Sequence, residues 1–368
     1  MSEIAGPPPA RPARRGLLGL VSDPVWQARL ARLPLVSRLV RHEGEALFDL
    51  VAGFAYSQVL QALIETGVLE RLRHGPQEAA ALAAGTGVPV ERMEILVRAG
   101  TALGLLRTAR GGRFRLTRRG AAAIGVPGLA EMIRHHALLY RDLADPVALL
   151  RGDAETETAR FWQYVAGRDD PAAAARYSEL MAASQAMVAA DTLDMVDLSG
   201  LGSLLDVGGG TGTFAAAAAA RCPALRITVL DLPEVVASRE RIRPAAGARI
   251  AFEGGSFLDP LPAGHDAVSL IRVLYDHSDE TVRRILAGVH AALPRGGRLI
   301  VSEPMTGGER PSRAGDVYFA LYTMAMGTGR ARSPDRIVEL LRDAGFTGIA
   351  RHRATRPFVT TAISARRA

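Results

Sequence analysis

The residues with the most distinctive chemistry lie in a glycine-rich stretch, "LLDVGGGTGTF", at residues 204–214. Asp206 ends an apolar run, and Gly208 and Gly210 allow the main chain to turn tightly and to approach a ligand closely. Asp231 follows 25 residues after Asp206, at the end of the next apolar run, where its carboxylate can accept hydrogen bonds from both hydroxyls of a ribose. This combination indicates a binding site for a nucleoside cofactor.

The charge of Asp206 helps to distinguish between two such cofactors. Glycines and a ribose-binding acid alone fit a dinucleotide enzyme equally well. A carboxylate directly before the glycines would repel a pyrophosphate, whereas the cationic sulfonium and amine of S-adenosylmethionine tolerate or favour it. The stretch therefore favours S-adenosylmethionine.

From residue 200 onward, apolar strands alternate with glycine loops and helices, and one helix is expected to begin near Thr213. The predicted strands are 203–207, 226–232, 249–254, 266–273, 298–304, 349–355 and 358–365. Alternating units with continuous apolar strands predict an α/β fold with a parallel, doubly wound, Rossmann-like sheet. The last two strands are joined without a helix, which predicts an antiparallel edge.

The N-terminal half has a different rhythm. Residues 44–106 carry apolar side chains at helical spacing, and residues 107–120 are typical of a hairpin turned by Gly111 and Gly112. Helices followed by such a hairpin predict a winged helix, so a winged-helix transcriptional regulator is the non-enzymatic alternative. Few polar side chains here suit the reading of base edges, and a long apolar helix at 46–64 needs a partner surface. Dimerisation, giving a homodimer, is therefore the favoured use of this module.

Composition limits the remaining classes. The net charge of +7 comes from basic residues that are all arginine, without any lysine, which indicates compositional bias more than a phosphate-binding surface. No nucleic-acid partner is therefore expected. The single cysteine, Cys222, excludes an intramolecular disulfide and a cysteine-rich metal site, and it favours a reducing compartment. We expect a cytoplasmic protein without a metal.

The N-terminal segment carries much of the charge. Residues 1–41 contain seven arginines among leucines and valines, a pattern that fits either an anionic membrane surface or a helix packed on the next domain. Residues 1–16 are rich in proline, alanine and arginine and are expected to be disordered. No apolar run reaches the length expected of a membrane span or a signal peptide. The segment adds peripheral association with the cytoplasmic membrane to the expectations.

Six motifs, taken in order and spacing, resemble a known enzyme family. They are "DVGGGTGTFA", "VLDLPEVV", "GSFLDPLP", "RVLYDHSDE", "LPRGGRLIVSEPM" and "GRARSPDRIVELLRDAGF". They are similar to the S-adenosylmethionine-dependent O-methyltransferases that include the plant caffeate and acetylserotonin enzymes. With the winged helix, the likeness covers nearly the whole chain after residue 45, and its motifs are specific.

The resemblance implies a division of the chain and a set of cofactor contacts. The division is a basic, partly disordered extension at 1–43, a winged-helix dimerisation domain at 44–125, a helical connector lining the substrate pocket at 126–198, and the S-adenosylmethionine-binding methyltransferase domain at 199–368. The contacts are Asp206, Gly208 and Gly210 near the methionine end, Asp231 on the ribose, and Ser256 with Phe257 beside the adenine. The family usually has aspartate at 256 and often lysine at 271. Here Ile271 replaces that lysine, and Arg272 is the expected substitute.

The reacting centre departs further from the family. Plant-type members place a histidine base at position 275 and a tryptophan at 277, where this chain has Tyr275 and His277. Glu303 matches a glutamate that orients the base, whereas the second such glutamate falls at Ala331. Imidazole can deprotonate a phenol of pKa about 10, but a tertiary alkanol is far less acidic, so the loss of histidine fits an aliphatic alcohol. We expect Tyr275 to position the hydroxyl group, and the proton to leave late to His277 or to water.

A closer likeness lies in "ALFDLVAGFAYSQ", "RVLYDHSDETVR" and "DVYFALYTMAMGTGRARS". These stretches are similar to the carotenoid O-methyltransferases of purple bacteria, which methylate the tertiary C1 hydroxyl of acyclic carotenoids such as demethylspheroidene and hydroxyneurosporene. The likeness implies a hydrophobic carotenoid substrate, and it adds the photosynthetic membrane as a site of peripheral association. Two rival enzymes share the motifs, a phenol or aromatic polyketide O-methyltransferase and a bacteriochlorophyllide C-methyltransferase.

The substrate pocket is expected to be largely apolar. Its candidate residues are His135, His136, Tyr318, Tyr322 and Met326. The last three share a helical face by their four-residue spacing, although core packing explains such a stripe equally well. Adjacent residues share a helix face poorly, so only one of the two histidines is expected to face inward.

Overall fold

The computed structural model describes residues 19, 22–30, 33, 36–166, 184–237 and 249–368. The chain forms two compact units, residues 1–121 and 122–368. The disorder predicted for residues 1–16, and the part of the connector at 167–183, lie outside the described residues.

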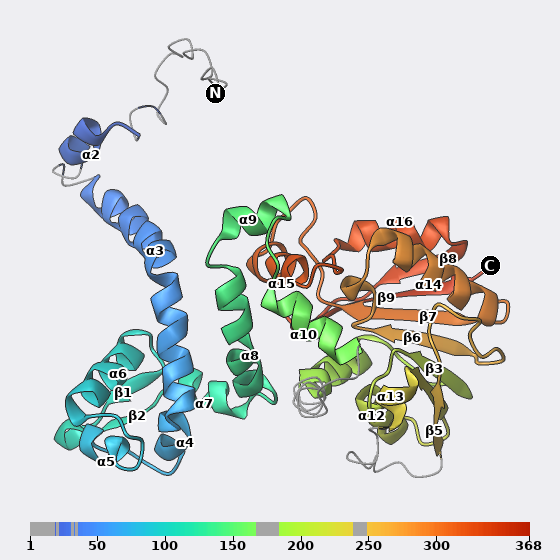
Figure 1. Ribbon diagram of the computed structural model, residues 1–368, viewed down its shortest axis with the longest axis horizontal. Helices are drawn as coiled ribbons and strands as arrows, with labels where there is room; N and C mark the ends of the chain where they lie inside the picture. The colour runs from blue at the N-terminus through green and yellow to red at the C-terminus, as the bar shows by residue number, and fades with distance from the viewer. Residues whose placement is uncertain (1–18, 20–21, 31–32, 34–35, 167–183, 238–248) are drawn as a thin grey trace. The chain divides into compact units, whose positions relative to one another are not determined.

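The first unit consists of helices and one hairpin (Figure 1, blue to cyan). Its described helices are α2 (Pro24–Leu30), α3 (Ser37–Glu65), α4 (Val68–Arg73), α5 (Ala79–Ala83) and α6 (Val90–Ala102). Strands β1 (Leu106–Thr108) and β2 (Phe114–Leu116) pair antiparallel across the short helix η1 (Arg110–Gly112). Gly111 and Gly112 both have a φ of +70°, a left-handed conformation that glycine adopts without strain, so the predicted hairpin is confirmed. Helix α7 (Arg118–Gly125) follows.

Helix α3 leaves most of its apolar side chains exposed. Leu63, near its C-terminal end, is its buried residue. The large exposed apolar side chains on it are Leu39, Leu47, Phe48, Leu50, Val51 and Phe54. Among the described helices, α3 is the one long and apolar enough to cross a membrane by length and composition. The expectation that no apolar run reaches that length was wrong, because the helix predicted at 46–64 extends to 29 residues.

The second unit contains a seven-stranded sheet with the strand order β5-β4-β3-β6-β7-β9-β8. Its strands are β3 (Ser203–Val207), β4 (Arg226–Asp231), β5 (Ile250–Gly254), β6 (Ala267–Ile271), β7 (Arg298–Glu303), β8 (Phe346–Arg351) and β9 (Thr361–Arg367). The first five are parallel, and β9 runs antiparallel to both β7 and β8. The parallel sheet and its antiparallel edge are therefore confirmed. The strand predicted at 349–355 instead begins at Phe346, which is buried.

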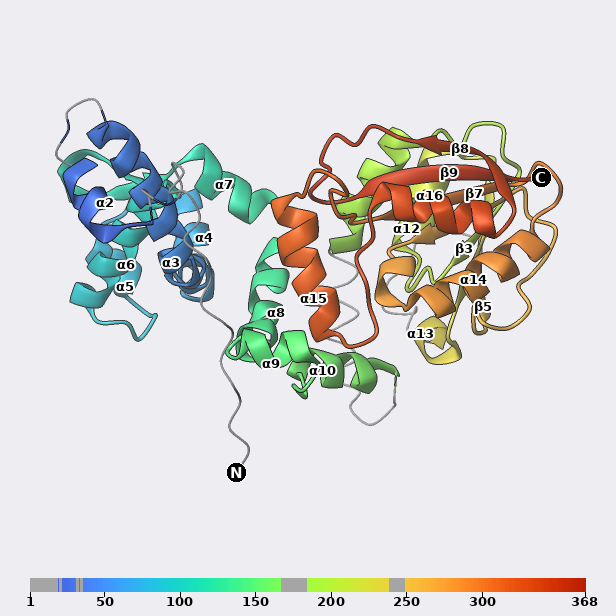
Figure 2. The ribbon, with the colours of Figure 1, turned by 90° about the horizontal axis from the view of Figure 1, so that it is seen from above.

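Apolar residues on the two faces of the sheet form two separate cores. Leu205 and its neighbours pack against α14 (Asp279–Ala292) and α16 (Pro334–Asp343). Leu204, which points to the opposite face, packs with α12 (Thr213–Arg221) and with the helical residues 184–195. This alternation is the period-two pattern of a strand buried on both faces. Figure 2 shows the sheet and its covering helices from above.

The other described helices of this unit lie before the sheet and between its strands. They are α8 (Leu129–Asp142), α9 (Pro146–Arg151), α10 (Glu157–Ala166), α13 (Pro233–Ala237), the 3-10 turn η4 (Leu274–Asp276), the π-helical η5 (Arg313–Phe319) and α15 (Ala320–Ala325). Helices α8, α10 and α15 pack against one another. The stripe predicted at 318–326 therefore crosses from a π-helix into an α-helix.

Candidate active site

The glycine loop follows β3 at the edge where the parallel strands end. Gly208 has a φ of +66° and Gly210 a φ of +59°, both in the region that favours glycine. A Cβ atom on Gly208 would lie 2.8 Å from a methyl group of Val273, so the loop approaches the segment after β6 closely. A Cβ on Gly210 would meet no atom within 4 Å. The loop is thus packed on one side and open at Gly210.

Asp231 fixes the loop from the end of β4. Its Oδ2 accepts a hydrogen bond from the main-chain N–H of Gly210 at 2.7 Å, and its Oδ1 accepts one from Leu232 at 2.8 Å. Burial raises the pKa of this carboxyl, and the two N–H groups oppose that rise. A carboxylate beside an open glycine loop fits the ribose contact predicted for it.

Asp206 is fully buried beneath the loop. Its Oδ1 accepts a hydrogen bond from the Ser269 hydroxyl at 2.6 Å, whereas its Oδ2 is buried without a partner among the described residues. Burial raises the pKa of the carboxyl to about 7; the Ser269 hydrogen bond opposes this and the charge of Asp231 adds to it. A buried acid with an unpartnered oxygen gains from a cationic ligand. These residues therefore fit S-adenosylmethionine, whose amine and sulfonium are cationic.

The residues predicted to contact the adenine, Ser256 and Phe257, lie in the loop after β5. The Ser256 hydroxyl accepts a hydrogen bond from the N–H of Leu258 at 3.1 Å, so this serine already orders its own loop. The rings of Phe257 and His277 meet edge to face, with centroids 5.1 Å apart. This contact brings the loop beside the reacting centre, and it agrees with a packing role for His277. Burial, followed by the cation of Arg332, lowers the pKa of His277.

The turn η4 carries Tyr275, the predicted reacting centre, and its main chain is held from the sheet. Arg272 connects β6 to this turn with a φ of +59°, a strained conformation for a residue other than glycine, and its N–H donates to the Ser302 carbonyl at 2.8 Å. The N–H of Tyr275 donates to Oε2 of Glu303 at 3.0 Å. Glu303 is fully buried on β7. It therefore orients the main chain of residue 275, whatever side chain stands there.

The hydroxyl of Tyr275 is engaged by Arg272. It accepts hydrogen bonds from Nε and Nη2 of that guanidinium at 3.3 and 3.0 Å, and Nη1 donates to Ser184 at 2.9 Å. Burial raises the pKa of Tyr275 above its ordinary value, although the Arg272 cation opposes the rise. With both lone pairs accepting, the hydrogen of the neutral phenol is its remaining donor, and without substrate this hydrogen bonds to the Asp276 side chain. A neutral phenol is a poor base, and the positioning role of Tyr275 stays a prediction. Arg272 was predicted to contact the cofactor, and its guanidinium binds the Tyr275 hydroxyl.

Asp276 is a second titratable group on the turn, and the sequence analysis passed over it. Its Oδ1 is buried without a partner among the described residues. Burial raises the pKa of its carboxyl to about 8; Arg272 and a hydrogen bond from the Tyr275 side chain oppose the rise, and the charge of Glu303 adds to it. The pKa of Glu303 is likewise raised to about 7, mainly by burial. The only signal in the sequence was an acid directly after Tyr275.

The residues predicted to line the substrate pocket include two pairs that contact each other. His135 lies 2.9 Å from the Tyr322 hydroxyl, and His136 lies 2.7 Å from the Tyr318 hydroxyl. The expectation that only one histidine faces inward was wrong. Each imidazole forms a hydrogen bond with a different tyrosine, and the two tyrosines lie one helical turn apart. Burial lowers the pKa of both histidines, that of His135 to about 4 with a contribution from His136, so both are neutral donors or acceptors. Met326 packs in the apolar cluster around Tyr322.

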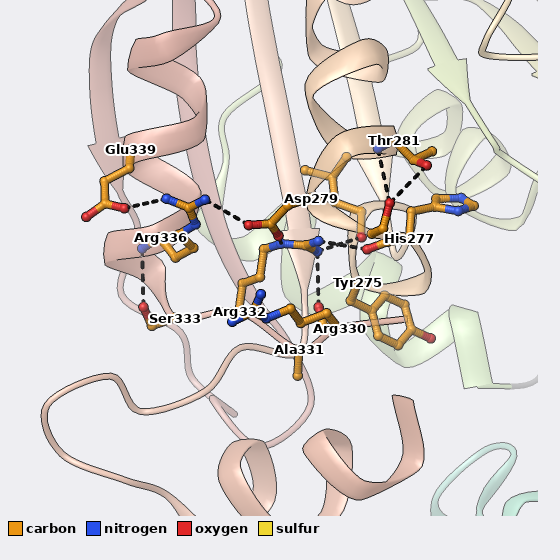
Figure 3. Close-up of polar contacts among 12 residues, drawn as sticks. Tyr275, His277, Asp279, Thr281, Arg330, Ala331, Arg332, Ser333, Arg336 and Glu339 are labelled. Carbon is orange, nitrogen blue, oxygen red and sulfur yellow. Dashed lines mark hydrogen bonds and ion pairs between the residues drawn. The ribbon is translucent and has the colours of Figure 1, made fainter. Parts of the chain in front are cut away.

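Position 331 lies in a loop that contacts the turn. Ala331 donates its N–H to the Thr323 hydroxyl at 3.2 Å. The neighbouring Arg332 is fully buried and points its guanidinium at Asp279 and at carbonyls of the turn, as Figure 3 shows. Arg332 could not be predicted as a buried residue from the sequence, since arginine is rarely buried. Among the described residues, no group of histidine, cysteine, aspartate and glutamate could hold a metal ion.

Comparison with known proteins identifies the family. Residues 140–347 match the O-methyltransferase domain, and residues 48–124 match the O-methyltransferase dimerisation domain. The chain is 51% identical to demethylspheroidene O-methyltransferase of Cereibacter sphaeroides, over 96% of this chain and 97% of that protein. It is 49% identical to the enzyme of the same name from Rhodobacter capsulatus, over 99% of this chain and 93% of that protein.

A solved structure agrees with both the fold and the cofactor. Human N-acetylserotonin methyltransferase in complex with S-adenosylmethionine (SAM) has a TM-score of 0.74 and 27% identity, covering 88% of this chain and 97% of that chain. The predicted methyltransferase sheet, the N-terminal helical domain and S-adenosylmethionine as the cofactor are thereby confirmed. The chain is an S-adenosylmethionine-dependent methyltransferase and belongs to the O-methyltransferase family, dimerisation domain included.

Proposed function

We propose that this enzyme methylates the tertiary C1 hydroxyl of an acyclic 1-hydroxy carotenoid of the demethylspheroidene or hydroxyneurosporene type. The observation that carries the proposal is the neutral, Arg272-bound tyrosine at position 275, where phenol-methylating relatives are expected to have an imidazole base. The names of the two relatives at 51% and 49% identity support the same substrate.

An alcohol of this kind demands alignment more than early deprotonation. When bound, S-adenosylmethionine supplies an electrophilic methyl group. The carotenoid oxygen forms the new bond to that methyl carbon while the carbon–sulfur bond breaks, and the hydroxyl proton must then leave. Holding the oxygen in line and excluding water can contribute roughly 7–11 kcal/mol. Tyr275 serves this step by hydrogen bonding to the hydroxyl group.

The proton requires an acceptor within the site, and Asp276 has the properties of one. Its pKa, raised to about 8, makes its carboxylate a stronger base than an ordinary aspartate. Its buried Oδ1 has no partner among the described residues that would compete for that proton. We therefore place the proton on Asp276 after methyl transfer. This replaces the earlier expectation of His277, whose ring packs on Phe257 and whose pKa is lowered.

The polyene part of the substrate would contact residues next to the reacting centre. Tyr318 and Tyr322 stack at 6.0 Å between ring centroids, with their hydroxyls tied to the two histidines. This pairing satisfies the polar atoms, and Tyr322 and Met326 are buried in an apolar cluster beside them. Apolar surroundings of this kind support a hydrophobic carotenoid as the substrate.

The decisive experiment is methylation by the purified enzyme with labelled S-adenosylmethionine and a 1-hydroxy carotenoid in detergent micelles. We expect label in a C1 methyl ether, identified by mass spectrometry. A carotenoid of equal length without the C1 hydroxyl is the matched control. Label in a phenol or in bacteriochlorophyllide, with none in the carotenoid, would replace this proposal by one of the rival enzymes.

We further propose a homodimer formed through α3. The matched dimerisation domain begins at residue 48, and the exposed apolar side chains of α3 offer a surface that a second copy can bury. Leu50→Asp combined with Phe54→Asp should give a monomer in sedimentation, whereas Val147→Asp, an exposed apolar position on α9, should not. A wild-type monomer at micromolar concentration would contradict the dimer.

The enzyme is also proposed to be cytoplasmic and to touch a membrane peripherally. The seven arginines of residues 1–41, interleaved with apolar side chains, support this location, and a carotenoid substrate would be delivered from lipid. Flotation with phosphatidylglycerol vesicles should recover the full chain at low salt. Equal recovery after deletion of residues 1–36, which removes five of the seven arginines, or no recovery at all, would refute the role of that segment.

A further inference from the structure

One short segment, residues 328–332, contacts the whole main chain of the turn that carries the reacting centre. Four successive carbonyls of the turn accept a hydrogen bond from it. They are Leu274 from Arg332 Nη1 at 2.8 Å, Tyr275 from the Arg330 N–H at 2.7 Å, Asp276 from the Thr328 hydroxyl at 3.1 Å, and His277 from Arg332 Nη2 at 2.7 Å. Each carbonyl of residues 274–277 is therefore held by a hydrogen bond from this segment.

Arg332 makes two of these four contacts and has no exposed side-chain surface. Its Nε donates to Oδ1 of Asp279 at 2.8 Å, and Nη1 also donates to the Arg330 carbonyl at 3.0 Å. Burying a cation is costly, and a planar guanidinium reaches several acceptors in fixed directions that a lysine ammonium cannot. Figure 3 shows the guanidinium lying between Asp279 and the His277 carbonyl.

The same segment also connects the turn to the pocket. The N–H of Ala331 donates to Thr323 on α15, the helix that carries Tyr322. On the opposite side, Glu303 holds the N–H of Tyr275. Tyr275 and Asp276 therefore stand on a main chain fixed from both sides and set in register with the pocket helix.

We propose that Arg332 is a positioning residue for methyl transfer. Its guanidinium holds the Leu274–His277 main chain so that the side chains of Tyr275 and Asp276 face the accepting oxygen in one geometry. The proposal rests on placing the reacting centre at this turn, as in the proposed function. Misplacing reacting groups by about 1 Å can cost roughly 10²-fold in rate, so loss of the clamp should be visible in turnover.

The test compares Arg332→Lys with Arg336→Gln. Arg336 shares Asp279 through Oδ2 at 2.8 Å and binds Glu339, but it donates to no carbonyl of the turn. We expect Arg332→Lys to lower kcat about 10- to 100-fold while the Kd of S-adenosylmethionine changes less than about threefold. Arg336→Gln should leave both unchanged. An equal loss in the two variants would assign the effect to the Asp279 ion pair and overturn the clamp.

Hydrogen exchange provides a readout that does not depend on the acceptor substrate. In Arg332→Lys, amides of residues 272–280 should exchange about tenfold faster or more, with β3 and β4 unchanged. Unchanged exchange together with normal kcat would refute the proposal. If the wild type bound S-adenosylmethionine but did not methylate the carotenoid, the proposed function would fail, and the exchange result would still decide the clamp.

A milder variant covers the case in which Arg332→Lys does not fold. Thr328→Val removes one carbonyl contact from an exposed position and keeps the buried guanidinium. We expect a fall in kcat of about two- to tenfold and faster exchange at Asp276 and His277. Wild-type values for both measurements in this variant would overturn the clamp.

Discussion

The glycine loop after β3 and the turn after β6 follow neighbouring parallel strands but are held in different ways. The conformation of the loop depends on particular residues: glycines in the left-handed region and the carboxylate of Asp231. The turn is held by its N–H and carbonyl groups, which are the same for any side chain. The first arrangement fixes which cofactor binds. The second does not depend on the side chain at position 275, where this chain has tyrosine and the resemblance to plant-type members implies histidine.

Among changes at the turn, removing the proposed proton acceptor Asp276 should have the largest effect on kcat. Asp276→Asn keeps the shape of the side chain but cannot hold the proton, so we expect kcat to fall by about 10²-fold or more with unchanged S-adenosylmethionine affinity. Asp343→Asn, at an exposed position on α16, is the control. A loss below about threefold would show that solvent takes the proton.

On the loop side, Asp231→Ala should weaken the binding of S-adenosylmethionine. The ribose would lose a charge-assisted acceptor worth roughly 1.5–3 kcal/mol, which is about a ten- to hundredfold rise in Kd. The Gly210 N–H would lose its partner as well. Asp231→Asn keeps one oxygen acceptor and should lose less. Calorimetry that shows unchanged affinity in Asp231→Ala would remove this residue from the site.

The pH dependence of cofactor binding should report on Asp206. Its carboxyl has a pKa of about 7, and a cationic ligand prefers the charged form. Affinity should therefore increase as pH rises through that pKa, by roughly eightfold between pH 6 and pH 7.5. Asp206→Asn should bind more weakly and show no such rise. An unchanged slope in this variant would assign the titration to another group.

The smallest effect is expected at Tyr275. Tyr275→Phe loses the hydroxyl's hydrogen bonds, worth about 0.5–1.5 kcal/mol, so kcat should fall only severalfold. The hydrogen bond from Tyr275 lowers the pKa of Asp276, so its loss should also move the acid limb of the pH profile to higher pH. Single-turnover rates would measure both changes. A thousandfold loss would indicate that Tyr275 is the proton acceptor, and it would contradict the assignment of that role to Asp276.

The cofactor loop could be predicted from the sequence because its parts are local. Asp206, the glycines and Asp231 lie within two adjacent strand–loop units, and apolar runs such as "SLLDV" indicate the strands that place them. The clamp could not be predicted, since Arg332 meets the Leu274 carbonyl across 58 residues and arginine is ordinarily exposed. The start of β8 was misplaced for a similar reason, because a register shift between Thr347 and Ala350 hides the strand period.

The prediction that only one of the two adjacent histidines faces inward rested on helix geometry alone and was wrong. Two adjacent histidines diverge around a helix axis, which argues against a shared target. The structure supplies two targets instead, one helical turn apart, at Tyr318 and Tyr322. Such a pairing depends on the partner helix, which the spacing of the histidines does not reveal.

The buried acids of the active site also have a consequence for folding stability. Asp206, Asp276 and Glu303 have pKa values of about 7, 8 and 7 in the folded chain, above the value of about 4 expected when unfolded. Between pH 4 and pH 8 these three carboxyls thus hold more protons in the folded state than in the unfolded state, so their contribution to stability falls as pH rises through that window. In the ligand-free enzyme this loss is largest under mildly alkaline conditions, where the three acids are most fully charged, and a cationic cofactor offsets it there.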